Sequence, residues 1–490
     1  MPDWFEKFLP ILILLGVVIL VISRLPRVPG ISHSPEFRRR RVLNWLPLGL
    51  IYAFLYMGRY NLTVAKDAFG DALMDNADFG WIFGAGTFVY GFSFLLNGPL
   101  TDRYGGKFAI LLGAGGAVIF NALMGIVTLL VTQSADPGQS FLGGNLTSIF
   151  ALLYSGNMYF QSFGAVAIVK CNAPWFHVRE RGVFGAIFGI LISLGIYFAF
   201  DWGYMIIQSL PLAWVFFIPA ILLIIFWFLV FSIVRNTPGD AGFADFDTKD
   251  ASSGDDGPNL GAIAVFKMML SNPVILTIAS IEFCSGFLRQ AIMQWYRTFA
   301  KQTGISEGFV YENWGMLLCA AGIMGGVFAG VISDHIFKSR RGPVAAALYA
   351  LMFIGAVILT FTYQTSLLGP TIIFMSLCVI GVHGMLSGTA SMDFGGRRNT
   401  GIAVGIIDGF VYAGTGVMAF TYAMILPKPG TAENNPASDP DNWIAWPITM
   451  IPIAVIGFFL ATKIWNATPK PQKTPTTMAA STQTEGHTKP

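Results

Sequence analysis

The feature that most constrains this chain is a series of apolar blocks near 20 residues long, because a helix of that length crosses the apolar core of a bilayer. Residues 218–234 form one such block. Only 12% of the residues are charged and 54% are apolar, so a water-soluble surface cannot be built from them. Segments of about ten residues with alternating polarity, typical of a transmembrane barrel, are not found. The sequence therefore predicts an all-α polytopic membrane protein and excludes a soluble enzyme.

The apolar blocks and their polar breaks define a membrane map. Twelve core spans are predicted, at residues 43–65, 79–100, 106–132, 142–169, 183–204, 212–234, 273–295, 309–333, 344–366, 371–390, 401–424 and 443–465. A thirteenth span at residues 4–22 is interpreted as uncleaved, because basic residues follow it rather than precede it. Lys and Arg gather in every second connection, and the opposite loops hold only Lys66, Arg297, Lys301 and Lys428. The positive-inside rule then places the N-terminus outside and the C-terminus inside.

The longest internal connection divides the core spans six and six, and its aspartates, Gly and Ser are typical of a linker. The predicted organisation is an extra span with a basic loop (1–41), a first six-helix half (42–234), an acidic cytoplasmic linker (235–272), a second six-helix half (273–465) and a disordered tail (466–490). The four cysteines have no paired spacing, which indicates packing residues rather than a disulfide framework or a metal site.

Two landmarks recur in both halves. A Gly-x-x-x-Asp motif ends the second core span at Asp102 and the eighth at Asp334. Arg59 in the first span and Arg289 in the seventh are related by nearly the same offset. A duplicated six-span unit is the architecture of many secondary transporters, whose substrate site lies near the midplane between the halves.

The two arginines inside spans need an explanation, because each costs about 2.5–3.5 kcal/mol on insertion scales. In the functional interpretation, Arg59 and Arg289 face a shared aqueous cavity and offer forked donors to a phosphate. In the alternative, each is neutralised structurally, and Glu282 lies two turns before Arg289 on one helical face. The functional interpretation is favoured, because ionisable groups inside the membrane are functional by default and the two arginines occupy matching positions.

Other polar residues in the spans are candidates for substrate contact or coupling. Three tyrosines near the first arginine either bind substrate oxygens or simply pack: Tyr56, Tyr60 and Tyr90. Glu282 or Asp408 could carry a coupling proton, and for Asp408 a hydrogen bond to a neighbouring helix is an equal alternative. His383 is more typical of an interhelical hydrogen bond than of a proton relay. Lys66 and Lys170 lie toward opposite span ends, and solvated placement is expected for both.

Several motifs resemble those of known transporters. The stretch Gly-Pro-Leu-Thr-Asp-Arg-Tyr-Gly-Gly-Lys at 98–107 is similar to the signature loop of the major facilitator superfamily, and residues 330–342 resemble its echo in the second half. Further motifs resemble the organophosphate:phosphate antiporter family: Arg59-Tyr-Asn61, Tyr90-Gly-Phe-Ser93, Gln161-Ser-Phe-Gly164, Trp175-Phe with Arg179-Glu-Arg-Gly182, and Gly286-Phe-Leu-Arg289. The similarity covers about residues 42–465. It implies a major facilitator fold of two six-helix halves, here with one extra N-terminal helix, in which Arg59 and Arg289 bind the substrate phosphate.

The resemblance also implies a gate. In the superfamily, charges at the cytoplasmic ends of the spans couple the helices in the closed state and separate on opening. The candidates in this sequence are Asp102, Arg103, Asp334, Arg179, Glu180 and Arg181.

Two departures from the antiporter family put its usual substrates in question. A lysine usual on the second helix is replaced by Phe94, and the histidine that glycerol phosphate transporters carry on the fifth helix corresponds to Ile192. Both changes remove potential anion contacts, whereas the arginine pair is intact.

The sequence thus predicts a secondary active transporter of an organic phosphate, of the sugar phosphate or glycerol phosphate type, that exchanges it for inorganic phosphate by alternating access. We expect a monomer in a bacterial inner membrane, with no cofactor, metal or nucleic-acid partner. The alternatives are a proton-coupled organic anion symporter and a transport-like sugar-phosphate sensor. An enzyme is disfavoured, because no nucleophile–base set, metal-ligand cluster or phosphate loop is found.

Overall fold

The computed structural model describes residues 16, 33–177, 180–246, 262–332, 336–337, 340–428, 430 and 435–467. This part of the chain is helical and contains no strand. Apart from Gly16, the predicted span at 4–22 lies outside the described residues, as does the tail from residue 468 onward.

The helices fall into two groups. The first half contains α2 (Pro35–Phe69), α3 (Asn76–Tyr104), α4 (Gly106–Thr132), α5 (Phe141–Gly144), α6 (Leu146–Gln161), α7 (Phe163–Asn172), α8 (Arg181–Tyr197), α9 (Gly203–Ser209) and α10 (Trp214–Ile233). A short helix, α11 (Ala262–Leu270), precedes the second half, which contains α12 (Pro273–Gln302), α13 (Phe309–Glu312), α14 (Trp314–Val331), α15 (Arg341–Thr362), α16 (Leu368–His383), α17 (Ser391–Ile425) and α18 (Ala445–Lys463). Two π-helical segments, η3 (Phe198–Trp202) and η6 (Gly384–Ala390), extend α8 and α16.

Nine helical segments of the described chain are long and apolar enough to cross a membrane, which confirms the polytopic fold. The other three predicted core spans coincide with α2, with the α6–α7 pair and with α14, and they are helical as well. Helix α2 contains more polar residues than the nine apolar segments do. The helix at residues 146–172 is divided at Ser162 into the shorter α6 and α7. The exact number of twelve core spans and one additional span stays a prediction.

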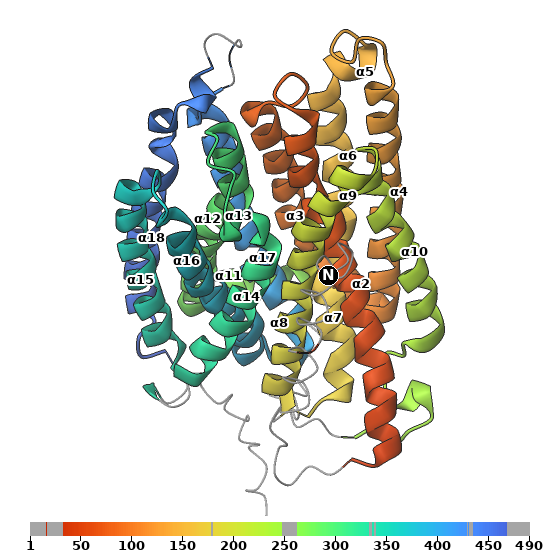
Figure 1. The fold of residues 1–490 in the computed structure, drawn as a ribbon. Coiled ribbons are helices and arrows are strands. Elements are labelled where there is room, and N and C mark those ends of the chain that lie inside the picture. Colours follow the sequence, from red (N-terminus) through yellow and green to blue (C-terminus); the bar gives the residue numbers. More distant parts are fainter. Residues whose placement is uncertain are drawn as a thin grey trace, which may run out of the picture.

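The two halves lie side by side, with the first half at the right and the second half at the left of the view, and their helices run along the long direction of the molecule (Figure 1). The turn from α4 to α6 lies at the upper end in this view, and the start of α2 lies at the lower end. Between the halves, α3 packs along α17 and α8 packs along α14. Glycines allow the first pair to approach closely: a Cβ atom at Gly91 would lie 3.0 Å from the carbonyl oxygen of Gly409.

Local caps set where the first two helices begin and end. The Ser34 side chain accepts from the Phe37 amide at the start of α2. Gly70 follows α2 with a φ of 72°, a left-handed conformation that glycine adopts without strain. Asp75 and Asp78 then form a reciprocal capping box at the start of α3. These caps fix the direction of the two helices that carry the first candidate site residues.

Candidate functional site

Arg59 is completely buried at the interface between the halves. Its Nε donates to Gln161 Oε1 at 2.9 Å, and one terminal nitrogen donates to the Tyr412 hydroxyl of the second half. The other terminal nitrogen lies 3.4 Å from the Tyr90 hydroxyl. The guanidinium also lies over the ring of Tyr56, 4.5 Å from its centroid. A cage of tyrosines and one amide therefore surrounds this arginine.

One face of α6 holds the Arg59 segment of α2 in place. The Tyr154 hydroxyl donates to the Arg59 carbonyl oxygen at 3.0 Å, and Asn157 Nδ2 donates to the Gly58 carbonyl oxygen at 2.9 Å. The Gln161 side chain donates to Asn157 at 3.1 Å. These three α6 residues follow one another at helical spacing, so a single face of α6 presents them all to α2.

No acidic side chain among the described residues forms an ion pair with Arg59. The N–H groups of Arg59 donate to neutral oxygens, and its guanidinium makes cation–π contacts with tyrosine rings. The guanidinium thus keeps its full positive charge for an anion that enters the interface.

Arg289 on α12 is also buried, but it is less completely satisfied. Its Nε is buried without a hydrogen-bond partner in the structure. The Arg289 guanidinium interacts electrostatically with Tyr60, Tyr56, Tyr412 and Glu282, and Tyr56 interacts with both arginines. The predicted substrate residues of the two halves therefore share one group of tyrosines.

A ladder of amides and hydroxyls continues from this group across the interface. Gln290 Nε2 donates to the Tyr60 hydroxyl at 2.9 Å, and Gln294 Nε2 donates to Gln290 Oε1 at 2.7 Å. Thr63 donates to Gln294. All four side chains are buried and uncharged, so this part of the interface is polar.

The predicted coupling residues gather in the second half. Glu282 Oε2 lies 2.8 Å from His383 Nδ1, and Glu282 Oε1 is buried without a partner. Asp408 accepts from the Ser387 hydroxyl and interacts electrostatically with His383, Glu282 and Arg289. Glu282 therefore pairs with His383 of α16. The alternative considered from the sequence, an ion pair between Glu282 and Arg289, is not formed in the structure.

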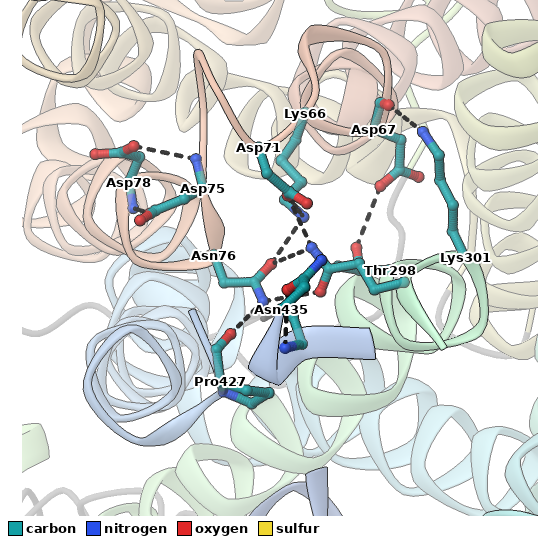
Figure 2. A network of polar contacts seen from close by, with 12 residues as sticks. Lys66, Asp67, Asp71, Asp75, Asn76, Asp78, Thr298, Lys301, Pro427 and Asn435 are labelled. Atoms are coloured by element: carbon teal, nitrogen blue, oxygen red, sulfur yellow. Dashed lines mark hydrogen bonds and ion pairs between the residues drawn. The ribbon is translucent and has the colours of Figure 1, made fainter. Parts of the chain in front are cut away.

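A buried polar network closes the upper end of the interface (Figure 2). Lys66 Nζ donates to Asn76 Oδ1 at 2.8 Å and lies 3.9 Å from Asp71. Asn76 Nδ2 in turn donates to Gln302 Oε1 of the second half at 3.0 Å and to the Pro427 carbonyl oxygen at 2.8 Å. Lys66 is only 3% exposed, so the expectation of a solvated lysine is wrong. The second half covers this span end and supplies the polar partners that water would have supplied.

Two aspartates extend this closure. Asp67 accepts from the Tyr204 hydroxyl at 2.6 Å and from Thr298 at 3.3 Å, and its carbonyl oxygen accepts from Lys301. Asp201, in the π-helical segment η3, accepts from the backbone amides of Gly315 and Met316 at 2.7 and 2.9 Å. A carboxylate of the first half thus caps helix α14 of the second half.

Two of the predicted gating residues at the lower end, Asp102 and Glu180, form ion pairs within the first half. Asp102 accepts from Lys170 at 2.7 Å, and Lys170 is partly exposed. Glu180 lies 3.0 Å from Arg41. Arg103 rests against the neighbouring Tyr104 ring. Arg179 and Asp334 lie outside the described residues, and of Arg181 the structure describes only its place at the start of α8.

The Glu180 carboxyl lies outside the membrane-spanning segments. Burial on its own raises its pKa, but Arg41, the His177 amide and His33 together outweigh burial and hold the pKa below its usual value. Glu180 therefore stays ionised at neutral pH and ties α8 to the start of α2.

The two ends differ in how the halves are joined. Where both partners are described residues, the hydrogen bonds between the halves lie at the level of Arg59 or toward the upper end. The structure therefore represents a state whose upper end is closed by polar contacts.

Sequence reasoning missed several residues that surround the arginines: Gln161, Tyr412, Gln290 and Gln294. A signal existed for the amides, because Asn157 and Gln161, like Gln290 and Gln294, are polar pairs four residues apart in predicted spans. Tyr412 has no such signal.

The two departures from the antiporter pattern, Phe94 and Ile192, are both packing residues: Phe94 contacts Tyr90 of the site, and Ile192 packs against the apolar core. Phe94 is buried and packs edge-on against Tyr90, with ring centroids 5.1 Å apart. Ile192 is partly buried against the apolar core. Both positions are therefore apolar packing positions. The described residues also contain no group of His, Cys, Asp and Glu that could hold a metal ion, and all four cysteines are free and buried.

Comparison with known proteins gives one consistent result. A model of the Major Facilitator Superfamily matches residues 48–420. The glycerol-3-phosphate transporter of Bacillus subtilis is 26% identical over 80% of this chain and 87% of its own length. A probable hexose phosphate transport protein of Chlamydia pneumoniae is 22% identical over 90% of this chain and 94% of its own length. The membrane sensor protein UhpC of Salmonella typhimurium is 22% identical over 80% of this chain and 86% of its own length. The crystal structure of a bacterial homologue of the human lysosomal transporter Spinster, in an inward-facing conformation, superposes with a TM-score of 0.61 at 14% identity, and covers 89% of this chain and 98% of that one.

Proposed function

Because the chain belongs to the Major Facilitator Superfamily, we propose that it is a secondary transporter that carries a small organic phosphate across the membrane by alternating access. Its relatives confirm the resemblance to the organophosphate:phosphate antiporter family. The observation that carries the proposal is the pair of buried arginines, Arg59 and Arg289, which face one group of tyrosines from opposite halves.

The surroundings of the arginines suit a phosphate. Arg59 bonds only neutral groups, and Arg289 has a buried nitrogen without a partner. A phosphate oxygen could therefore bind these donors without displacing a protein carboxylate from either arginine. Tyr56, Tyr60 and Tyr90 would supply further hydrogen bonds to the substrate.

Transport then requires the two halves to rock about this site. In the observed state the upper end is closed by the Lys66–Asn76–Gln302 contacts. We infer that these contacts break on the opening of that end, while Asp102, Arg103, Asp334, Arg179, Glu180 and Arg181 act as the gate at the lower end. The distribution of Lys and Arg favours a cytoplasmic lower end, with the N-terminus outside and the C-terminus inside.

In this proposal the counter-substrate is inorganic phosphate. An empty site would leave two buried arginines without an anion, so the unloaded carrier would reorient slowly and exchange would dominate. The protein would work as a monomer of two six-helix halves in a bacterial inner membrane.

The test is uptake of radiolabelled phosphate into proteoliposomes preloaded with phosphate, with unlabelled organic phosphates as competitors. Arg59→Lys and Arg289→Lys are each expected to reduce exchange by about 100-fold or more, because a lysine cannot make the forked contact and a charge-assisted pair contributes about 1.5–3 kcal/mol per hydrogen bond.

The matched control is Arg297→Lys, on the same helix as Arg289. Arg297 is buried and lies 3.5 Å from the centroid of the Tyr204 ring, but at the upper end of the bundle. We expect this variant to keep the competition ranking of the wild type. Equal losses in all three variants would mean that any buried arginine is needed for folding, and the proposed phosphate site would then be wrong.

A second candidate function is supported by the Glu282–His383 pair, which lies beside Arg289. A carboxyl and an imidazole in contact can carry a proton, so the protein could instead be a proton-coupled symporter of an organic anion. Uptake that is driven by a pH gradient without internal phosphate, and is lost in Glu282→Gln, would favour symport. Binding of a sugar phosphate without any flux would favour a sensor, as in the relative named for that role.

A further inference from the structure

Three basic residues gather around the last turn of α10 at the lower end of the first half. They are Arg40 of α2, Lys107 of α4 and Arg235, which follows α10. Their side chains donate to the last carbonyl oxygens of the helix: Arg40 Nη2 to Ile233 at 2.7 Å, Lys107 Nζ to Phe231 at 2.6 Å, and Arg235 Nη1 to Ser232 and Val234 at 2.9 Å each. Three elements that are far apart in the sequence thus bring like charges to one place.

None of these three charges has an ion-pair partner in the described part of the chain, although Lys107 also interacts electrostatically with Asp240. Burial and the neighbouring Arg235 guanidinium lower the pKa of Arg40, and Lys107 interacts electrostatically with both arginines. By contrast, Arg41 and Lys170 at the same end each have a carboxylate partner. Mutual repulsion of this kind favours an anionic ligand.

Capping of α10 leaves most of the donors in this cluster unused. A guanidinium has five N–H groups and an ammonium has three. Arg40 Nη1 is buried without a hydrogen-bond partner, and Lys107 Nζ makes one hydrogen bond to the protein. Charge at a helix C-terminus stabilises it, but one or two cations suffice for that effect. The remaining donors suit a phosphate, which accepts several hydrogen bonds at once.

The surface beside the cluster is apolar and faces lipid. Helix α10 is the least buried of the nine candidate spans, with 28% of its most apolar stretch inside the protein. Large aromatic side chains are exposed next to the cations, among them Phe231 and Phe228 of α10 and Phe108 of α4. Basic residues at the end of such a helix lie at the depth of the lipid headgroups.

We propose that Arg40, Lys107 and Arg235 bind the headgroup phosphate of an anionic phospholipid in the leaflet at the lower end of the molecule. The acyl chains lie along the exposed aromatic side chains of α4 and α10. Free inorganic phosphate has the same charge chemistry, but it would leave this aromatic surface without a role. Arg40 precedes Arg59 on the same helix α2 by 19 residues, about five helical turns, so the proposed lipid site is separate from the arginine centre.

The experiment is native mass spectrometry of the full-length protein in detergent, titrated with cardiolipin, phosphatidylglycerol or phosphatidylcholine. A triple variant, Arg40→Gln, Lys107→Gln and Arg235→Gln, removes the cluster. The matched control, Lys267→Gln, Arg340→Gln and Lys463→Gln, removes three positive charges from α11 and from the lower end of the second half. Because each basic residue near an anionic membrane contributes roughly fivefold in affinity, the cluster variant is expected to lose about 100-fold in anionic lipid binding. The control is expected to bind as the wild type does.

Equal retention of all three lipids by the wild type, or unchanged retention by the cluster variant, would overturn the proposal. Complete displacement of the lipid by millimolar inorganic phosphate would assign the site to a soluble anion and would overturn it as well. If the triple variant does not fold, Arg40→Lys keeps the bond to Ile233 but loses the guanidinium fork, and it is expected to lower cardiolipin retention severalfold without changing that of phosphatidylcholine.

Discussion

The two ends of the bundle handle their charges in different ways. At the upper end, buried polar side chains bind across the interface, as Lys66, Asn76 and Gln302 do. At the lower end, Asp102 and Glu180 bind partners within the first half, and these partners are partly exposed. Buried polar groups must keep their partners, and at the upper end these partners come from the other half. At the lower end the Asp102–Lys170 pair is the more exposed and is worth little, and the Glu180–Arg41 pair holds only parts of the first half together. The upper end is therefore the more strongly held of the two in this state.

A cross-link is the most direct way to test this difference. In a background with the four cysteines replaced by alanine, Asn76→Cys and Gln302→Cys are joined at the upper end by a bifunctional methanethiosulfonate reagent. The reagent spans the gap left by the shorter cysteine side chains, since the native side chains meet at 3.0 Å. Cross-linking is expected to abolish transport, because the upper end can no longer open, and reduction is expected to restore it. Proteoliposome uptake before and after the reagent, and again after reduction, measures both.

The control is Asp102→Cys with Lys170→Cys joined by the same reagent, at a pair whose native side chains meet at 2.7 Å within the first half. This cross-link is expected to leave transport unchanged. A loss of uptake here would show that α3 and α7 move relative to each other, and the proposed rocking of rigid halves would be wrong.

Removal of one amide should shift the equilibrium without locking it. Asn76→Ala leaves Lys66 without its 2.8 Å acceptor and Gln302 Oε1 without its donor, while Gln302 Nε2 keeps its bond to Asp71. The penalty for unsatisfied buried groups is about 1–3 kcal/mol, so opening of the upper end should increase by roughly 5- to 150-fold. The measurement is the rate at which Thr63→Cys is alkylated by a thiol reagent added from the upper side. An unchanged rate would mean that the network does not hold this end closed.

Two helix caps sharpen the comparison further. Asp201→Ala removes a cap that joins the halves, and Asp75→Ala removes a cap within the first half. Each loss should cost about 0.5–2 kcal/mol of stability. Only Asp201→Ala is expected to raise the alkylation rate at position 63 as well. Similar rates in both variants would show that the Asp201 cap stabilises α14 alone.

The smallest effect is expected at the lower end. The pKa of Glu180 lies below its usual value in the folded protein, so its ionisation contributes stability above the unfolded-state pKa. That contribution is lost as the pH falls below about 4. Melting temperatures of wild type and Glu180→Gln should therefore differ at pH 7 and pH 5 and converge at lower pH. A difference that persists below this range would trace to packing rather than to the charge.

Much of the fold could be predicted, because burial in lipid imposes long apolar helices and the sequence shows them directly. The ends of the helices were harder. Residues 142–169 give one apolar block, but the structure interrupts the helix at Ser162, and residues 198–202 adopt a π-helix. Apolarity reports that a segment is in the membrane, and it does not report the backbone geometry within it.

The site divides along the same line. Arg59 and Arg289 could be found, because a charge in an apolar block is expensive and visible. Tyr412 could not be found, because a tyrosine is common in membrane helices and carries no distinctive signal. Its contact with Arg59 also joins residues 353 positions apart in the sequence. The error on Lys66 has a similar origin: its partner network is completed by Gln302, from a helix that local sequence cannot place.

In the proposed site, the tyrosines around Arg59 have a consequence for which anions can be distinguished. A phenol hydroxyl accepts one hydrogen bond and can donate another. Tyr412 can therefore hold the Arg59 guanidinium and turn its own proton toward an incoming anion at the same time. A carboxylate in that place would neutralise the arginine and repel the anion. The hydrogen bonds from the phenols thus add to the attraction of the arginine charge. An oxyanion with several acceptor oxygens can use more of these bonds than a halide of equal charge, so we expect it to bind more tightly.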